Sequence, residues 1–166
     1  ARGRMPLESL AVLPVITGLA FVFRTAGIAA QEVVIALAGD GPEDRRVLGR
    51  FTLRLGAAAS ALFGLVVFTP LATVWYETVS GLAPDLASFA LLPGALLVLL
   101  PFIESVLSYE RGLLVLAHRT PSITVAVAVQ LAVTAAVFAL TVLVLKIAGA
   151  VAIGPALTAG YICGVA

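Results

Sequence analysis

Apolar residues in this chain gather into five long segments, and most polar residues fall between them. A helix that crosses a lipid bilayer needs about 20 predominantly apolar residues, and segments on this scale recur along the whole chain. We expect spans at about residues 7–39, 51–76, 86–116, 121–145 and 149–166. The pattern predicts an all-α protein, a polytopic transmembrane bundle of about five helices, with residues 1–166 forming a single helical unit.

Prolines and one arginine interrupt these segments. The first segment is longer than one straight crossing needs and is divided at Arg24, so it forms either one long helix or two half-helices. Pro70 is expected to kink the second segment before it ends at the interfacial aromatics Trp75 and Tyr76. Two prolines inside the third segment predict a bent helix supported by its neighbours: Pro93 and Pro101.

Basic residues indicate how the chain is oriented. They flank two linkers that lie two crossings apart and hence on the same side: Arg45, Arg46, Arg50 and Arg54 at the first, and Arg111 and Arg119 at the second. Short loops rich in arginine and lysine stay in the cytoplasm, so we expect these linkers there, in a multi-pass protein of the cell (inner, cytoplasmic) membrane. Lys146 stands alone on the opposite side, where Arg2 and Arg4 also fall, against the rule.

Composition supports the membrane assignment and narrows the chemistry. Hydrophobic residues make up 61% of the chain and charged residues 11%, and the mean hydropathy is +1.15, whereas soluble domains are about 45–50% apolar and about 25% charged. The net charge of +1 gives no reason to expect nucleic acid as a partner. One histidine and one cysteine, Cys163, without clustered carboxylates predict no metal site. We find no catalytic constellation and no phosphate-binding loop, and we expect neither a cofactor nor an enzyme.

One charged residue inside a span carries the functional hypothesis. Arg24 lies deep within the first segment, and a charge there is costly unless it faces a cavity, a partner or a ligand. Thr17, Arg24 and Gln31 are spaced seven apart and share one helical face, and Gly27 lies on the same side and would open space beside Arg24. An arginine keeps its proton and needs an anion beside it. We expect Arg24, Gln31 and Thr17 to bind an anionic substrate.

The partner of Arg24 has alternatives. Glu32 and Glu104 are the carboxylates inside the spans that could pair with it. A buried pair that only holds helices together, or an arginine that reaches a membrane interface, would explain the same residue without any substrate. Glu104, close to Pro101, either couples transport to protons or pairs with Arg24 or Arg111. Gln130 is expected to form a hydrogen bond to another helix.

Several stretches, taken in order, resemble a known family. An acidic and then basic linker opens a helix across residues 34–41 and 43–50, and an apolar helix end follows at 68–76. A turn with arginine, a small residue and a basic-threonine pair occupies 109–120, and a run of small residues opens the next helix at 147–152. This order is similar to the C-terminal half of the multidrug/oligosaccharidyl-lipid/polysaccharide (MOP) exporter superfamily, of the polysaccharide- or lipid-flippase type or the progressive-ankylosis type.

The resemblance implies two helical bundles around a central cavity and alternating access, of which this chain would be the second bundle. The chain opens on Ala1 and ends in an apolar run, which also predicts a fragment of a longer transporter that lacks its N-terminal bundle. The expected function is export of an anionic lipid-linked sugar or another phosphate-bearing substrate, with membrane lipid around the helices. Two alternatives stay open: a small-anion exporter of the same superfamily, and a non-transporting membrane scaffold subunit in which Arg24 is fully paired.

Overall fold

The computed structural model describes residues 6–39, 41–144 and 149–165. Their regular structure is helical throughout, which confirms the all-α prediction. The elements are α1 (Pro6–Leu37), α2 (Pro42–Val67), α3 (Leu71–Thr73) continuing as η1 (Val74–Val79), α4 (Pro84–Leu96), α5 (Leu100–Leu116), α6 (Thr120–Ala139) continuing as η2 (Leu140–Val144), and α7 (Gly149–Val165). Arg2, Arg4 and Lys146 lie outside the described residues, so their positions stay predictions.

Four stretches of the described residues are long and apolar enough to cross a membrane: Leu7–Leu37, Pro42–Val67, Pro84–Leu116 and Pro121–Leu143. A shorter apolar helix covers Gly149–Gly164. By length and composition this is the pattern of a multi-pass membrane protein, and its apolar outer surfaces suit contact with membrane lipid.

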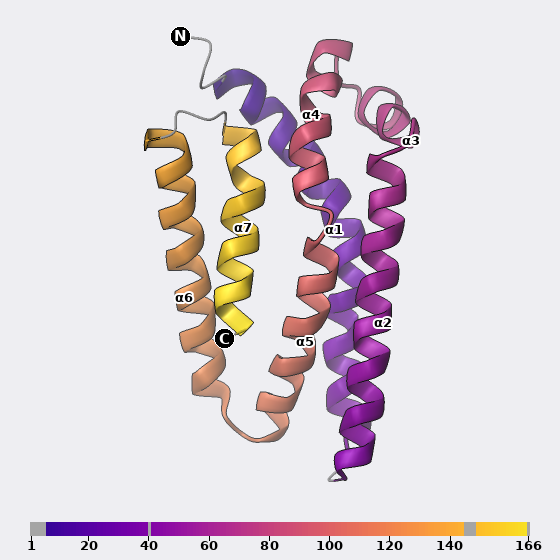
Figure 1. Ribbon diagram of the computed structural model, residues 1–166, viewed down its shortest axis with the longest axis vertical. Coiled ribbons are helices and arrows are strands. Elements are labelled where there is room, and N and C mark those ends of the chain that lie inside the picture. Colours follow the sequence, from indigo (N-terminus) through magenta and orange to yellow (C-terminus); the bar gives the residue numbers. More distant parts are fainter. Residues whose placement is uncertain (1–5, 40, 145–148, 166) are drawn as a thin grey trace.

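The helices form two groups that meet at α7 (Figure 1). α1 and α2 form one hairpin, and α4 and α5 run end to end beside it, with α5 packed against both α1 and α2. α6 and α7 form a second hairpin, and α7 contacts α4, α5 and α1. The linker between α1 and α2 and the turn between α5 and α6 lie at the same end of the bundle (Figure 1). We call this the arginine-rich end, because Arg45, Arg46 and Arg119 lie in or beside these two connections.

α1 is one continuous helix, which decides between the two alternatives for the first segment. It runs from Pro6 to Leu37 without a break at Arg24. Its 32 residues correspond to about 48 Å at about 1.5 Å per residue, more than the hydrocarbon thickness of about 30 Å. Arg24 therefore lies inside a helix, far from either end. Its side chain can reach a partner only on a neighbouring helix.

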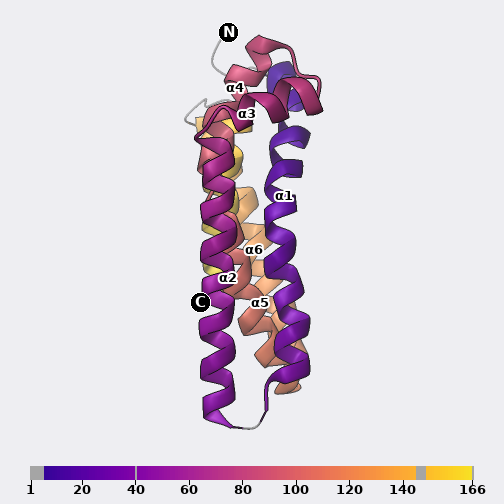
Figure 2. The ribbon, with the colours of Figure 1, turned by 90° about the vertical axis from the view of Figure 1, so that its right-hand side faces the viewer.

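The second segment differs from the prediction of one kinked span to Tyr76. α2 ends at Val67, a turn follows, and the separate short helix α3–η1 lies across that end of the bundle (Figure 2). Pro70 lacks an amide hydrogen and its ring clashes with the preceding turn, so the helix stops rather than bends. Tyr76 is fully buried instead of standing at an exposed interface.

The third segment is bent, as its two prolines predict. α4 and α5 are separated by a turn at residues 97–99, in which the Leu97 amide donates to the Gly94 carbonyl at 3.1 Å. Pro101 stands at the start of α5, where a missing amide hydrogen costs nothing, and Pro93 is accommodated inside α4. The break allows α5 to change direction and places Glu104 in its first turns, between α1 and α7.

Two kinds of packing hold the bundle together. Apolar side chains fill the half away from the arginine-rich end, where the rings of Phe23 and Phe63 stack with their centroids 5.1 Å apart. Nearer the arginine-rich end, small residues allow close approach. A Cβ on Gly27 would lie 2.7 Å from Ser105 Oγ, and a Cβ on Gly56 would lie 2.8 Å from Ser105 Cβ. Gly27 therefore opens no space beside Arg24; α5 fills the position.

Candidate functional site

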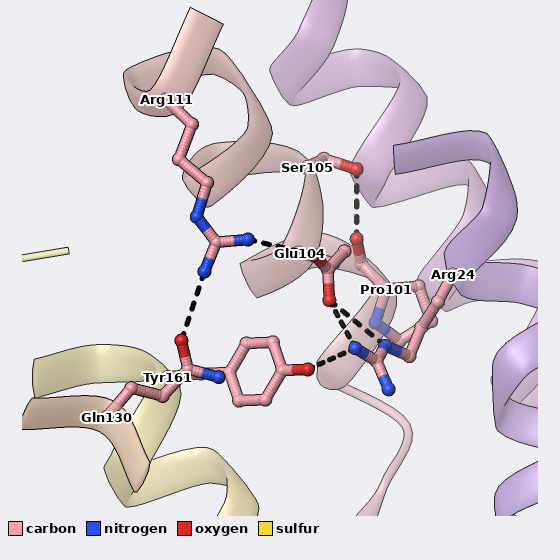
Figure 3. A network of polar contacts seen from close by, with 7 residues as sticks. All are labelled: Arg24, Pro101, Glu104, Ser105, Arg111, Gln130 and Tyr161. Carbon is pink, nitrogen blue, oxygen red and sulfur yellow. Dashed lines mark hydrogen bonds and ion pairs between the residues drawn. The ribbon is translucent and has the colours of Figure 1, made fainter. Parts of the chain in front are cut away.

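Arg24 bonds to two other helices near the middle of the bundle (Figure 3). Its Nε donates to Glu104 Oε2 of α5 at 3.1 Å, and its Nη2 donates both to that oxygen and to the Tyr161 hydroxyl of α7. The exposed fraction is 19% for the Arg24 side chain and 5% for that of Glu104. Arg24 lies about 20 Å along α1 from Leu37, and it is a half-buried, paired arginine whose guanidinium group turns to α5 and α7.

A second arginine shares the same carboxylate from the other side. Arg111, two turns further along α5, places Nη1 3.8 Å from Glu104 Oε1. Its Nη2 donates to Gln130 Oε1 of α6 at 3.1 Å, which confirms the predicted bond from Gln130 to another helix. Arg111 Nε is buried and has no hydrogen-bond partner among the described residues. In Figure 3, Glu104 lies between the two guanidinium groups.

Tyr161 is the member of this network that the sequence reasoning missed. Besides its hydroxyl contact, its ring lies under the Arg24 guanidinium, with Cζ 5.0 Å from the centroid, in a cation–π arrangement. The neighbouring Gly160 explains how Tyr161 arrives there, since a Cβ at that position would overlap Thr134 of α6 and lie 2.7 Å from the Gln130 carbonyl. A tyrosine beside a glycine in an apolar segment is a weak signal, but it was available in the sequence.

The network carries more positive than negative charge. Two guanidinium groups, Arg24 and Arg111, face one carboxylate, Glu104, and the other two members, Gln130 and Tyr161, carry no formal charge at neutral pH. An arginine cannot lose its proton under these conditions. The cluster therefore has a formal charge of +1 among its own members, inside a region that the hydropathy assigns to the membrane.

The other predicted site residues lie apart from this cluster. Thr17 is two turns away on α1 and bonds within its own helix, to the Leu13 carbonyl at 2.7 Å. Gln31 is half-buried where α1 meets Gly112 of α5, with its backbone carbonyl in close approach. Glu32 is exposed and forms no ion pair with the described residues, so Glu104 rather than Glu32 is the partner of Arg24. The substrate-binding roles of Arg24, Gln31 and Thr17 stay predictions.

Three open grooves lined by described residues lie elsewhere on the bundle. The largest of these three, about 490 Å³, is bounded by residues of the α2–α3 corner and α4, and a small one of about 150 Å³ lies between α2 and α5. The third, about 390 Å³, lies between α6 and α7 and includes Val129 and the exposed Cys163 in its lining. None of the three is lined by Arg24, Glu104 or Tyr161. No group of three or more metal-ligating side chains occurs within the described ranges.

The chain matches no family model, no curated protein and no solved structure. The likeness to the MOP exporters therefore rests on the sequence stretches alone and stays a prediction.

Proposed function

We propose that this protein is part of a multi-pass transporter that moves an anionic, phosphate-bearing substrate across the membrane by alternating access, in the manner expected of a MOP-type exporter. The single observation that supports this proposal is the surplus positive charge of the network around the buried Glu104. Charged side chains inside membrane helices are costly, and they commonly mark the paths of ions and substrates.

A purely structural pair would need only one arginine. Arg24 is already satisfied by Glu104 and Tyr161, whereas Arg111 holds the same carboxylate only at 3.8 Å and keeps a buried Nε without a partner. The planar guanidinium fork suits phosphate oxygens, which it binds through two parallel hydrogen bonds. In the proposed mechanism an incoming anion takes over donors of Arg111 and neutralises the surplus charge, while Arg24 and Tyr161 hold Glu104 in place.

A non-transporting membrane scaffold is the second candidate, and specific contacts favour it. Arg24 is paired, Gly27 packs tightly against Ser105, and none of the three grooves reaches Arg24. On this alternative the network only ties α1, α5, α6 and α7 together. A small-anion exporter differs from the first candidate in its substrate alone, and a comparison of lipid-linked phosphates with inorganic phosphate would separate the two.

The test uses the intact protein in lipid vesicles, with uptake or flipping of phosphate-bearing substrates as the readout. Arg111→Gln should reduce transport at least about tenfold, the factor that corresponds to losing about 1.4 kcal/mol of a charge-assisted hydrogen bond. Arg119→Gln is the matched control, because Arg119 is exposed in the turn after α5 and lies outside the network. Normal transport by a folded Arg111→Gln variant would leave the network with the scaffold role.

A further inference from the structure

Arg111 carries two hydrogen-bond donors on one edge of its guanidinium group, and only one of them has an acceptor. Nε and Nη2 lie along this edge, while Nη1 turns to Glu104 on the other side (Figure 3). Nη2 donates to Gln130 Oε1 of α6 at 3.1 Å. Nε is buried and has no hydrogen-bond partner in the described part of the chain. A buried donor without an acceptor is costly, so the protein itself satisfies this edge only in part.

A glutamine side chain cannot satisfy both donors of this edge. Its amide group has one oxygen that accepts, and its nitrogen is itself a donor. Arg24 shows the same edge with a charged partner, because its Nε and its Nη2 both donate to Glu104. A phosphate group presents two oxygens at once, and a guanidinium edge binds them through two parallel hydrogen bonds. Gln130 therefore occupies one of the two places that phosphate oxygens would fill.

The carboxylates near Arg111 leave this edge to another anion. Glu104 lies on the opposite side of the guanidinium group and is shared with Arg24. Glu110, the residue before Arg111, belongs to the lining of the separate groove between α2 and α5. No second carboxylate among the described residues forms an ion pair with Arg111. The surplus positive charge of the network is therefore not neutralised on the edge that faces α6.

The groove between α6 and α7 gives a phosphate group a way to this edge. Its volume of about 390 Å³ is within the range of about 300–1,000 Å³ that is usual for ligand pockets. Leu114 of α5, one turn after Arg111, and Gly164 of α7 both line it. A Cβ on Gly164 would lie 3.3 Å from Gln130 Oε1, so the Gln130 amide lies directly behind the groove wall. None of the described lining residues is acidic.

We infer that Gln130 is a positioning residue that holds Arg111 ready for a phosphate group, and that this group enters through the α6–α7 groove and displaces the Gln130 amide. Two phosphate oxygens then accept hydrogen bonds from Nε and Nη2 of Arg111, while Glu104 stays beside Nη1. The exchange is favourable because a neutral acceptor gives way to a charged one. The inference rests on the proposed function and assigns to it the binding edge, the displaced residue and the approach.

The test measures phosphate binding by the intact protein in lipid nanodiscs, with inorganic phosphate and a short-chain phosphatidic acid titrated separately by calorimetry. Gln130→Ala removes the amide that phosphate must displace, so phosphate should bind about three- to tenfold more tightly. If Gln130 only held helices together, this change would not tighten binding. Gln130→Glu places a carboxylate on the same edge, and the affinity should fall at least about tenfold. Thr134→Ala is the matched control, because Thr134 bonds only within α6, and it should leave the affinity unchanged.

Two further experiments test the geometry of the site and its approach. Arg111→Lys keeps the charge but lacks an edge with two fixed donors, so the affinity should fall at least about tenfold. This variant decides the matter if the Gln130 variants do not fold. A bulky maleimide on the exposed native Cys163, which lines the groove, should also weaken binding at least about tenfold. The same label on Leu92→Cys in a Cys163→Ala background is the control, because Leu92 lines the groove at the α2–α3 corner.

The outcomes separate this inference from the proposed function. Binding of inorganic phosphate, of phosphatidic acid or of both, with this order of variants, supports the inference and identifies the source of the phosphate group. The inference is wrong if neither ligand binds, if Gln130→Ala does not tighten binding, or if Arg111→Lys binds as tightly as the unaltered protein. A label on Cys163 without effect would overturn the groove as the approach. Each of these results leaves the proposed transport standing if Arg111→Gln reduces it. Conversely, the expected binding together with normal transport by Arg111→Gln would keep the phosphate site and remove the transport function.

Discussion

Replacing Glu104 should destabilise the protein more than replacing either of its arginines. Glu104→Gln keeps the size of the side chain but leaves Arg24 and Arg111, both half-buried, close together without a counter-charge. Arg24→Gln, in contrast, leaves a neutral pair, because Arg111 stays beside the carboxylate. The asymmetry follows from two cations sharing one anion, and it would be absent if Arg24 and Glu104 formed an isolated pair.

The magnitude can be worked from the distances. At an effective dielectric constant of about 20, the 3.1 Å contact of Arg24 Nε with Glu104 Oε2 gives about 5 kcal/mol of attraction, and the 3.8 Å contact of Arg111 gives about 4 kcal/mol. Desolvation offsets much of this, and breaking a buried pair typically costs about 3–5 kcal/mol. We expect that loss for Glu104→Gln and about 1–3 kcal/mol for Arg24→Gln, which loses only the Tyr161 contacts and one partner of the carboxylate.

The assay is equilibrium unfolding in mixed micelles, followed by the fluorescence of the single tryptophan, Trp75. A double-mutant cycle isolates the coupling: Arg24→Gln introduced into the Glu104→Gln background should cost almost nothing or restore stability, because it removes one stranded cation. Hydrogen bonds between membrane helices average about 0.6 kcal/mol in such cycles. A coupling below about 1 kcal/mol, or Arg24→Gln costing more than Glu104→Gln, would refute the charge-sharing account.

Three further outcomes follow from the packing. Gly27→Ala should lower the free energy of unfolding by about 1–3 kcal/mol, because the new Cβ would lie 2.7 Å from Ser105 Oγ. Gly18→Ala is the control, since a Cβ there meets no atom within 4 Å, and in the same assay it should be neutral or slightly stabilising. Gly160→Val should separate α7 from α6 and reduce the Arg24–Tyr161 coupling measured in a double-mutant cycle. Burial raises the pKa of Tyr76 to about 12, so this tyrosine loses its proton at a lower pH in the unfolded chain than in the folded one. The free energy of unfolding should therefore fall by about 1.4 kcal/mol per pH unit between pH 10 and 12. Tyr76→Phe should lose this pH dependence.

The pattern of apolar segments predicted the helices well where a short polar linker separates two of them. The bend of the third segment follows from proline chemistry, whereas the length of the first segment left open whether it forms one long helix or two half-helices. The end of α2 did not follow, because residues 68–76 are as apolar as a span. Only the arrangement of α3 and η1 across the bundle reveals that Pro70 ends the helix. Apolar composition indicates that a segment lies in an apolar environment. The point at which a helix ends or changes direction depends on the helices packed beside it.

The site was harder to predict because its members come from four helices. The seven-residue spacing of Thr17, Arg24 and Gln31 correctly places them on one side of α1, but a shared face spans about 21 Å of helix and does not bring side chains together. What brings Glu104 and Tyr161 to Arg24 is close approach at Gly27 and Gly160. Such approach depends on which helices are neighbours, and a single sequence carries little information on that.

The two groups of arginines show why isolation in the sequence is a poor guide to exposure in the fold. Arg24 stands out because apolar residues surround it, yet the bundle supplies a carboxylate and a hydroxyl within reach. Arg54 sits among other arginines and looks like the edge of a linker, yet it lies level with the Glu104 region on a face with no carboxylate in reach among the described residues. A paired cation is satisfied by the fold itself. An exposed cation such as Arg54 takes its partners from outside the described chain, so the arginine that looks isolated in the sequence is the one that the fold itself satisfies.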